Sequence, residues 1–144
     1  MRQGKNVMIT LHSTIDDLGE KEIYTFQQKG KFFTRNNFEV ILYEEVQEDG
    51  EKINNLITIQ PDRVHIKRSG FISMSQQFEV SHRTETYYEH PHGSIHMETY
   101  TNSIDYYSLN ETSQGKLVIV YTVTLNGMEK RKHIIELTYE EEDS

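Results

Sequence analysis

The sequence contains no cysteine and no tryptophan, and only two of its 144 residues, Pro61 and Pro91, are prolines. The absence of cysteine excludes disulfide bonds, thiolate zinc sites and cysteine nucleophiles, and it is typical of proteins that fold in a reducing compartment. Both prolines lie in turn-like settings, so they do not interrupt regular structure elsewhere. We therefore expect a cytoplasmic protein that folds without covalent cross-links.

Long hydrophobic runs are also missing. The longest one, Leu117–Tyr121, is far shorter than the ~20 residues that a membrane helix needs. The first residues include basic side chains, but His12 and Asp16 interrupt the apolar stretch that a signal peptide would require. We expect neither secretion nor a membrane span.

The sequence has fewer basic than acidic residues, and its formal net charge is −8. Such an excess of acid repels phosphate backbones, so nucleic acid is not an expected partner. One basic group does occur, at Lys130, Arg131, Lys132 and His133. It follows the turn Asn126-Gly127, where solvated charge on a strand edge is the ordinary explanation.

What the sequence does contain is alternation. From Val7 to Tyr139 it reads as about ten period-two segments joined by Gly, Asn and Asp turns, with no helical pattern. The expected strands are 7–15, 21–33, 38–43, 53–59, 64–69, 70–80, 82–88, 94–107, 116–125 and 129–139. We predict a single all-β domain spanning residues 1–144.

The turns predict how these strands are connected. Asp49-Gly50 and Asn126-Gly127 are typical of tight hairpins, the latter of type I′, and Asn36-Asn37 marks a further turn. Gly30 suits a bend or bulge at a barrel corner. Sequential antiparallel connections favour a closed up-and-down barrel of about eight to ten strands over a sandwich, since closure removes exposed strand edges.

One charged side chain is expected inside the barrel. Alternation places Arg68 on the same face as the apolar Val64 and Ile66. A buried guanidinium keeps its proton and must be neutralised. Three readings follow: an internal salt bridge to Glu44 or Glu45, an anchor for an anionic ligand, or a solvated strand end.

Tyrosine is abundant, with nine residues. Amphipathic rings can line a ligand cavity, but they also fill barrel walls and cross-strand pairs without any ligand. Tyr121 shares a face with Leu117 and Ile119, so we expect it inside, whereas Tyr106 and Tyr107 are expected to be exposed.

Histidine forms one cluster, at His90, His92 and His96, with the first two in a His-Pro-His-Gly turn. No further ligand lies at a recognised zinc spacing, so we expect no metal and no cofactor. The sequence has no nucleophile elbow and no phosphate-binding glycine loop, so it identifies no catalytic residue.

Several segments together carry a family resemblance: Tyr43-Glu44-Glu45, Arg68-Ser69-Gly70, Phe78, Tyr88-Glu89-His90-Pro91-His92-Gly93, Thr99, Thr101 and Gly115-Lys116-Leu117-Val118-Ile119-Val120-Tyr121. The chain resembles the YwiB-like family of small bacterial proteins over nearly its whole length. That resemblance implies a calycin-type barrel, related in shape to lipocalins and fatty-acid-binding proteins, in a cytoplasmic protein of unassigned role. It brings no catalytic residues.

The leading hypothesis is a non-enzymatic barrel that binds a small anionic or amphipathic molecule inside. Its candidate ligand-binding residues are Arg68, Tyr43, Glu45, Phe78, Tyr88, Thr101 and Tyr121. The alternative is a filled structural barrel that acts through a protein partner or through self-association as a homodimer. An enzyme using an internal Glu and Tyr for acid/base chemistry is the third hypothesis.

Overall fold

The computed structural model describes residues 4–17, 19–36, 38–109, 114–126 and 130–142. The regular secondary structure of these residues consists of ten β-strands: β1 (Lys5–Asp17), β2 (Glu20–Arg35), β3 (Phe38–Val46), β4 (Lys52–Ile59), β5 (Arg63–Gly70), β6 (Met74–Glu79), β7 (Arg83–His90), β8 (Gly93–Tyr107), β9 (Gln114–Leu125) and β10 (Lys130–Glu141). None of the described residues forms a helix long and apolar enough to span a membrane.

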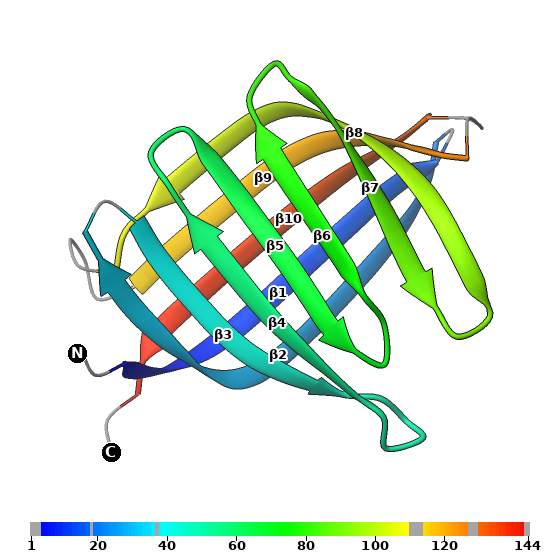
Figure 1. Ribbon diagram of the computed structural model, residues 1–144. Helices are drawn as coiled ribbons and strands as arrows, with labels where there is room; N and C mark the ends of the chain where they lie inside the picture. Colours follow the sequence, from blue (N-terminus) through cyan, green and yellow to red (C-terminus); the bar gives the residue numbers. More distant parts are fainter. Residues whose placement is uncertain (1–3, 18, 37, 110–113, 127–129, 143–144) are drawn as a thin grey trace.

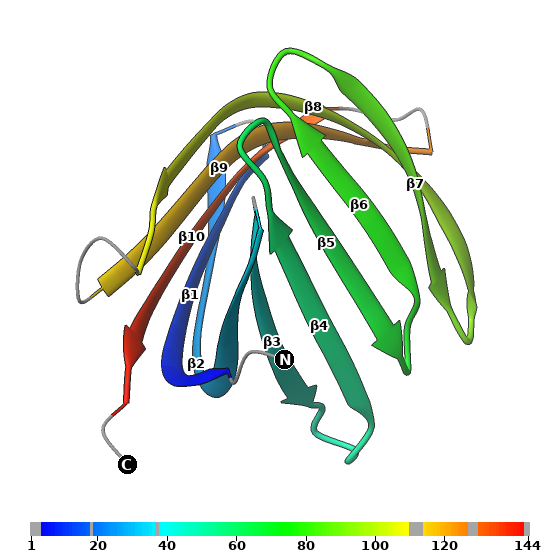
Figure 2. The ribbon, with the colours of Figure 1, turned by 60° about the vertical axis from the view of Figure 1, so that its left-hand side comes forward.

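All ten strands belong to one sheet, in the order β6-β5-β4-β3-β2-β1-β10-β9-β8-β7, and each is antiparallel to its neighbours (Figure 1). The first and last strands pair over a long ladder, from Val7 opposite Glu141 to Asp16 opposite Lys132. The predicted all-β, up-and-down barrel is confirmed as a nearly closed barrel. Figure 2 shows the wall of β9, β10, β1 and β2 facing the wall of β4, β5 and β6 across the interior.

The barrel closes between β6 and β7 along a seam that differs from the other strand pairs. These two strands share no continuous backbone ladder, and isolated bridges join the segments around them. Between the bridges, the hydroxyls of Thr84 and Thr86 donate hydrogen bonds to the carbonyl oxygens of Gln77 (2.7 Å) and Ser75 (3.1 Å). Side-chain hydroxyls therefore satisfy backbone carbonyls that a ladder would otherwise pair.

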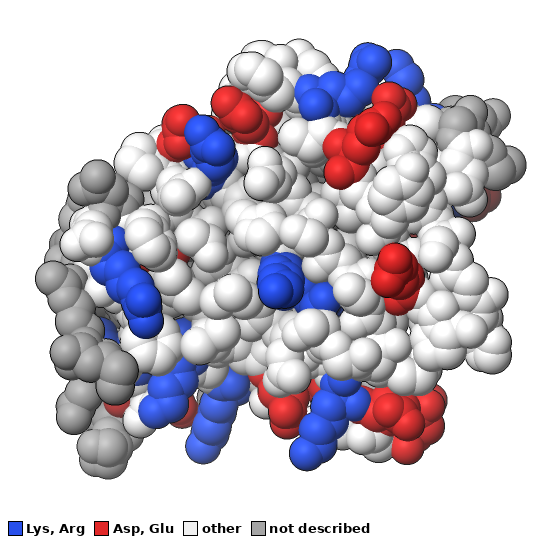
Figure 3. Space-filling model, in the orientation of Figure 1, with Lys and Arg blue, Asp and Glu red and all other residues white. Residues whose placement is uncertain are grey.

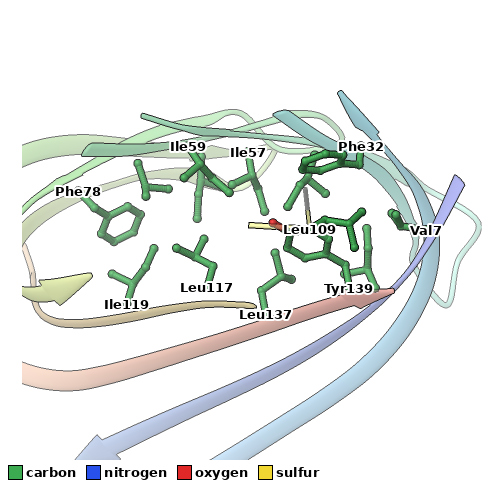
Figure 4. Close-up of a cluster of buried hydrophobic side chains, with 14 of the residues drawn as sticks. Val7, Phe32, Ile57, Ile59, Phe78, Leu109, Leu117, Ile119, Leu137 and Tyr139 are labelled. Carbon is green, nitrogen blue, oxygen red and sulfur yellow. The ribbon is translucent and has the colours of Figure 1, made fainter. Parts of the chain in front are cut away.

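Apolar side chains fill the half of the barrel where β1 begins and β10 ends, which we call the filled half. Figure 4 shows Phe32, Ile57, Ile59 and Phe78 pointing from one wall toward Leu117, Ile119, Leu137 and Tyr139 on the other. The members of this cluster are inward residues of their strands, which alternate with outward ones as the period-two pattern predicts. Leu109, which follows β8, is buried with them.

A polar cluster lies at the end of the filled half. The hydroxyl of Tyr106 donates to Glu39 and lies 2.7 Å from the hydroxyl of Tyr139, while Ser108 also donates to Glu39 at 2.7 Å. Tyr139 is fully buried, and both burial and the nearby Glu39 carboxylate raise its pKa above the ordinary value. The expectation that Tyr106 is exposed is therefore wrong, while Tyr107 is exposed as predicted.

A β-bulge explains why Tyr106 points inward. The register between β8 and β9 shifts between Thr101 and Ser103, and this extra residue reverses the alternation that follows it. Counted from the buried Thr99 and Thr101 without the bulge, Tyr106 would face outward.

One strand is shorter than predicted. The expected strand 70–80 begins only at Met74, because Gly70 has a φ of +113° and the chain turns there, with Ile72 buried in the connection. Asp49 and Gly50 lie in the β3–β4 hairpin as predicted. Asn126 has the positive φ that a type I′ turn requires, whereas its partner Gly127 is outside the described residues, as is Asn37.

The outer surface mixes charges of both signs. On the face shown in Figure 3, lysine and arginine side chains lie among acidic and uncharged ones. Lys130, Arg131 and Lys132 are exposed, as expected for solvated charge, but β10 pairs with both β1 and β9 and is not an edge strand.

Candidate functional site

The other half of the barrel is hollow. A cavity of about 550 Å³ lies between the filled half and the end of the barrel where β1 leads to β2. Six residues belong both to the apolar core and to the cavity lining; of these, Ile57, Leu117, Ile119 and Leu137 form its floor, and Ile66 and Tyr121 are the other two. Apart from the floor, the lining is Leu11, Ser13, Tyr24, Phe26, Tyr43, Glu45, Asn55, Ile66, Arg68, Met74, Gln76, Tyr88, Ile95, Met97, Tyr121, Leu125 and Ile135.

Arg68 lies inside the barrel, as its place in the β5 alternation predicts, and it is a lining residue of this cavity. Its Nη2 atom donates to Oε1 of Glu45 at 3.0 Å and its Nε atom donates to Oδ1 of Asn55 at 3.1 Å. The amide Nδ2 of Asn55 donates to the same Glu45 oxygen at 2.9 Å. The three side chains thus form a closed hydrogen-bonded ring, which we call the Arg68 cluster.

The register of three neighbouring strands brings this cluster together. Asn55 on β4 is directly opposite both Arg68 on β5 and Tyr43 on β3. Glu45 is two residues beyond Tyr43 and therefore faces inward with it, whereas Glu44 faces the other side. Of the two carboxylates expected as internal partners of Arg68, Glu45 is the one that pairs with it. The side chain of Arg68 is 25% exposed and that of Glu45 is 16% exposed.

Aromatic rings lead from the rim of the cavity toward the Arg68 cluster. Tyr24, which is 57% exposed, lies 5.8 Å from Phe26, and Phe26 lies 5.8 Å from Tyr43, as measured between ring centroids. Burial, and secondly the Glu45 carboxylate, raises the pKa of Tyr43, so its hydroxyl stays protonated. Tyr88, another predicted site residue, lines the same cavity.

Tyr121 forms the inner wall between the cavity and the core. Its ring meets Phe78 edge to face at 4.8 Å and stacks on the ring of His133 at 5.1 Å. Burial raises the pKa of Tyr121 and lowers the pKa of His133 to about 4, the latter with a contribution from Arg131. His133 is therefore a neutral, partly buried residue and does not belong to the solvated basic group with which the sequence analysis placed it.

The structure brings five of the seven predicted binding residues to the cavity and places the other two deeper. Phe78 is a fully buried core residue. Thr101 is also fully buried, opposite Tyr121, and among the described residues its hydroxyl has no hydrogen-bond partner.

The predicted histidine cluster lies on the β7–β8 hairpin. The rings of His90 and His92 stack at 5.1 Å, while His96 contacts Tyr87. Within the part of the chain that the structure describes, no group of three or more His, Asp or Glu side chains is arranged to hold a metal ion.

A larger hollow, of about 820 Å³, lies outside the filled end of the barrel. Its lining includes Asp62, Arg63 and Glu79, and Asp62 and Arg63 pair with each other at the surface. We place the candidate site in the interior cavity instead, because there apolar walls surround a small number of polar groups, as is typical of small-molecule sites.

Besides Ser13, the cavity lining contains two buried polar residues that were not predicted from the sequence, Asn55 and Gln76. Both interrupt apolar rows: Asn55 lies between Ile53 and Ile57, and Gln76 between Met74 and Phe78. Gln76 is 4% exposed, and its amide donates to the hydroxyl of Thr99 at 2.8 Å. A polar residue at an inward position of a strand is the signal that identifies them.

These observations define a class of protein, a nearly closed antiparallel β-barrel with one half packed and the other half hollow. The chain belongs to the family described as a domain of unknown function, DUF1934, whose profile matches residues 9–137. This confirms the predicted membership of the YwiB-like family.

A curated relative is the uncharacterized β-barrel protein YwiB of Bacillus subtilis (strain 168). It is 26% identical over 140 residues, which cover 97% of this chain and 96% of that protein. The crystal structure of the ywiB protein from Bacillus subtilis matches with a TM-score of 0.86 at 24% identity, covering 99% of this chain and 96% of that chain. This likeness shows that the fold is shared.

Breaking the Arg68 cluster from one side should destabilise the protein more than removing both charges. We expect Arg68→Met to cost about 1–3 kcal/mol, less than for a fully buried pair because both partners keep some solvent contact. The double variant Glu45→Gln/Arg68→Met should recover most of that loss, since no unpaired charge remains. Urea denaturation measures both, with Lys67→Met, at the adjacent exposed position, as the control. A double variant that is less stable than Arg68→Met would contradict the proposed coupling.

The buried His133 should make stability depend on pH in a defined window. Its pKa is lowered from 6.5 to about 4, so the unfolded chain binds this proton more readily than the folded one. The stabilisation from the neutral ring is therefore present above pH 6.5 and is lost as the pH falls toward 4. His133→Phe keeps a stacking ring but cannot titrate. We expect the free energy of unfolding of the wild type to fall relative to this variant across that window, and parallel curves would disprove the assignment.

Proposed function

We propose that this protein binds a small amphipathic molecule in the hollow half of the barrel. The observation that carries the proposal is the cavity of about 550 Å³, whose walls are mostly apolar and whose two charged side chains pair with each other in the Arg68 cluster. Sites for small molecules typically measure roughly 300–1,000 Å³ and combine apolar walls with a few fixed polar groups. An apolar body would lie against the floor, and a polar head group would lie at the Arg68 cluster.

The geometry supports the amphipathic reading more than the anionic one. An unpaired Arg68 would attract an anion, but Glu45 neutralises it at 3.0 Å. The interior also counts against the alternative of a filled barrel, because the apolar core fills only one half of it. Among the described lining residues no arrangement of groups identifies a reaction, and we therefore propose binding. We also propose a cytoplasmic location, which the lack of cysteine supports.

Filling the cavity should abolish binding of an uncharged apolar probe. Ser13 lines the cavity, whereas the adjacent Thr14 faces away from it on the same strand. We expect N-phenylnaphthylamine to gain fluorescence with the wild type and with Thr14→Phe, and to lose at least about tenfold in affinity with Ser13→Phe. Circular dichroism checks that both variants fold. If the fluorescence of the probe does not rise with the wild type, or if both variants bind the probe equally, the cavity does not bind this probe.

Self-association remains the alternative proposal, and exposed aromatic side chains support it. Tyr87, Tyr100 and Tyr107 are exposed, although Tyr106 no longer contributes because it points inward. Sedimentation velocity over a range of protein concentrations measures this directly. A concentration-independent monomer counts against a homodimer, and a dimer that dissociates on Tyr107→Ser supports it.

A further inference from the structure

The charges of the cavity lining cancel. Among the described residues that line the cavity, Glu45 and Arg68 are the two that carry a formal charge, one of each sign. They pair directly with each other at 3.0 Å. Both charges of the lining are therefore already paired, so a charged ligand would have no free counter-charge in this cavity. An uncompensated charge in an apolar cavity is costly.

The Arg68 cluster nevertheless keeps unused hydrogen-bonding capacity of both kinds. Nε and Nη2 of Arg68 donate to Asn55 and Glu45, and the described residues offer no partner to Nη1. Oε1 of Glu45 accepts from both neighbours, while Oε2 has no donor among the same residues. One donor group and one acceptor atom therefore remain available on two side chains that are already in contact.

We propose that the head group of the ligand is uncharged and carries a hydrogen-bond acceptor next to a donor, as a primary carboxamide does. This inference rests on the proposed function and specifies the ligand class. The amide oxygen would accept from Nη1 of Arg68, and the amide NH₂ would donate to Oε2 of Glu45. Both new bonds involve an ionised partner, which makes them stronger than bonds between neutral groups.

Either ionic head group would meet a like charge at the same place. A carboxylate within reach of Arg68 lies close to the Glu45 carboxylate, and an alkylammonium within reach of Glu45 lies close to the Arg68 guanidinium, because the two are bonded to each other. Each ion would gain one attraction and one repulsion, and it would lose its hydration. The uncharged amide avoids the repulsion and has the smaller desolvation cost.

Three probes of equal chain length test this inference: decanamide, decanoate and decylammonium. Isothermal titration calorimetry near neutral pH should show decanamide binding to the wild type at least about tenfold more tightly than either ion. The apolar tails are identical, so the head group determines the difference.

Charge variants of the cluster should redirect the preference. Glu45→Gln leaves a net positive cavity, so decanoate should bind best, whereas Arg68→Gln leaves a net negative one, so decylammonium should bind best. The double variant Glu45→Gln/Arg68→Gln is the matched control and should return the preference to decanamide. If Glu45 and Arg68 only stabilised the fold, the variants would bind all three probes more weakly, and the order of the three affinities would not change.

The outcomes separate this inference from the proposed function. If decanoate or decylammonium binds the wild type as well as decanamide or better, or if N-phenylnaphthylamine binds and none of the three alkyl probes does, the head-group inference is wrong and the cavity remains a binding site. If neither the naphthylamine nor any alkyl probe binds, the proposed function itself is wrong. Folded charge variants whose preference does not follow the remaining charge also contradict the head-group inference. A variant that fails to fold leaves the wild-type comparison unaffected.

Discussion

Closure of one ten-strand sheet is the constraint on which the rest of this structure depends. The sheet runs from β6 to β7 through the central pair of β1 and β10, and where the two outer strands meet, the hydroxyls of Thr84 and Thr86 satisfy backbone carbonyls of β6. About eight strands enclose a space that side chains just fill, so ten strands enclose more. Large rings such as Phe32, Phe78 and Tyr139 occupy that space in one half. In the other half, the inward side chains include Ser13 and Asn55 as well as larger rings such as Tyr43, and they leave the space between them open. The cavity thus follows from the strand number together with the choice of inward residues.

The Arg68 cluster determines the chemistry of the open space. A guanidinium cannot give up its proton, so its burial is tolerable only with partners, and Glu45 and Asn55 supply them from the two preceding strands. The same bonds hold each member in a fixed orientation, because Asn55 contacts both ions at once. The charged pair that faces the mostly apolar cavity is therefore held in place before any ligand arrives, which reduces the entropy lost on binding.

Local alternation explains what could be predicted from the sequence, and long-range register explains what could not. The strands and the inward direction of Arg68 follow from residues close in the sequence, and the family follows from segments spread over nearly the whole chain. Which carboxylate meets Arg68 depends on the register across β3, β4 and β5, and a one-residue slip would exchange Glu45 for Glu44. Tyr106 was misplaced because a bulge earlier in β8 reverses its face. His133 was grouped with its charged neighbours, although it shares the inward row of Leu137 and Tyr139.

The pairing of the first strand with the last also has a consequence for how the chain is synthesised. During synthesis β1 can pair with β2 as soon as that strand has emerged, but its second neighbour, β10, is the last of the ten strands to be made. One edge of β1 therefore stays without its native partner until β10 is available. Because a free strand edge can pair with another chain, this order of synthesis favours contacts between nascent chains until β10 has been added.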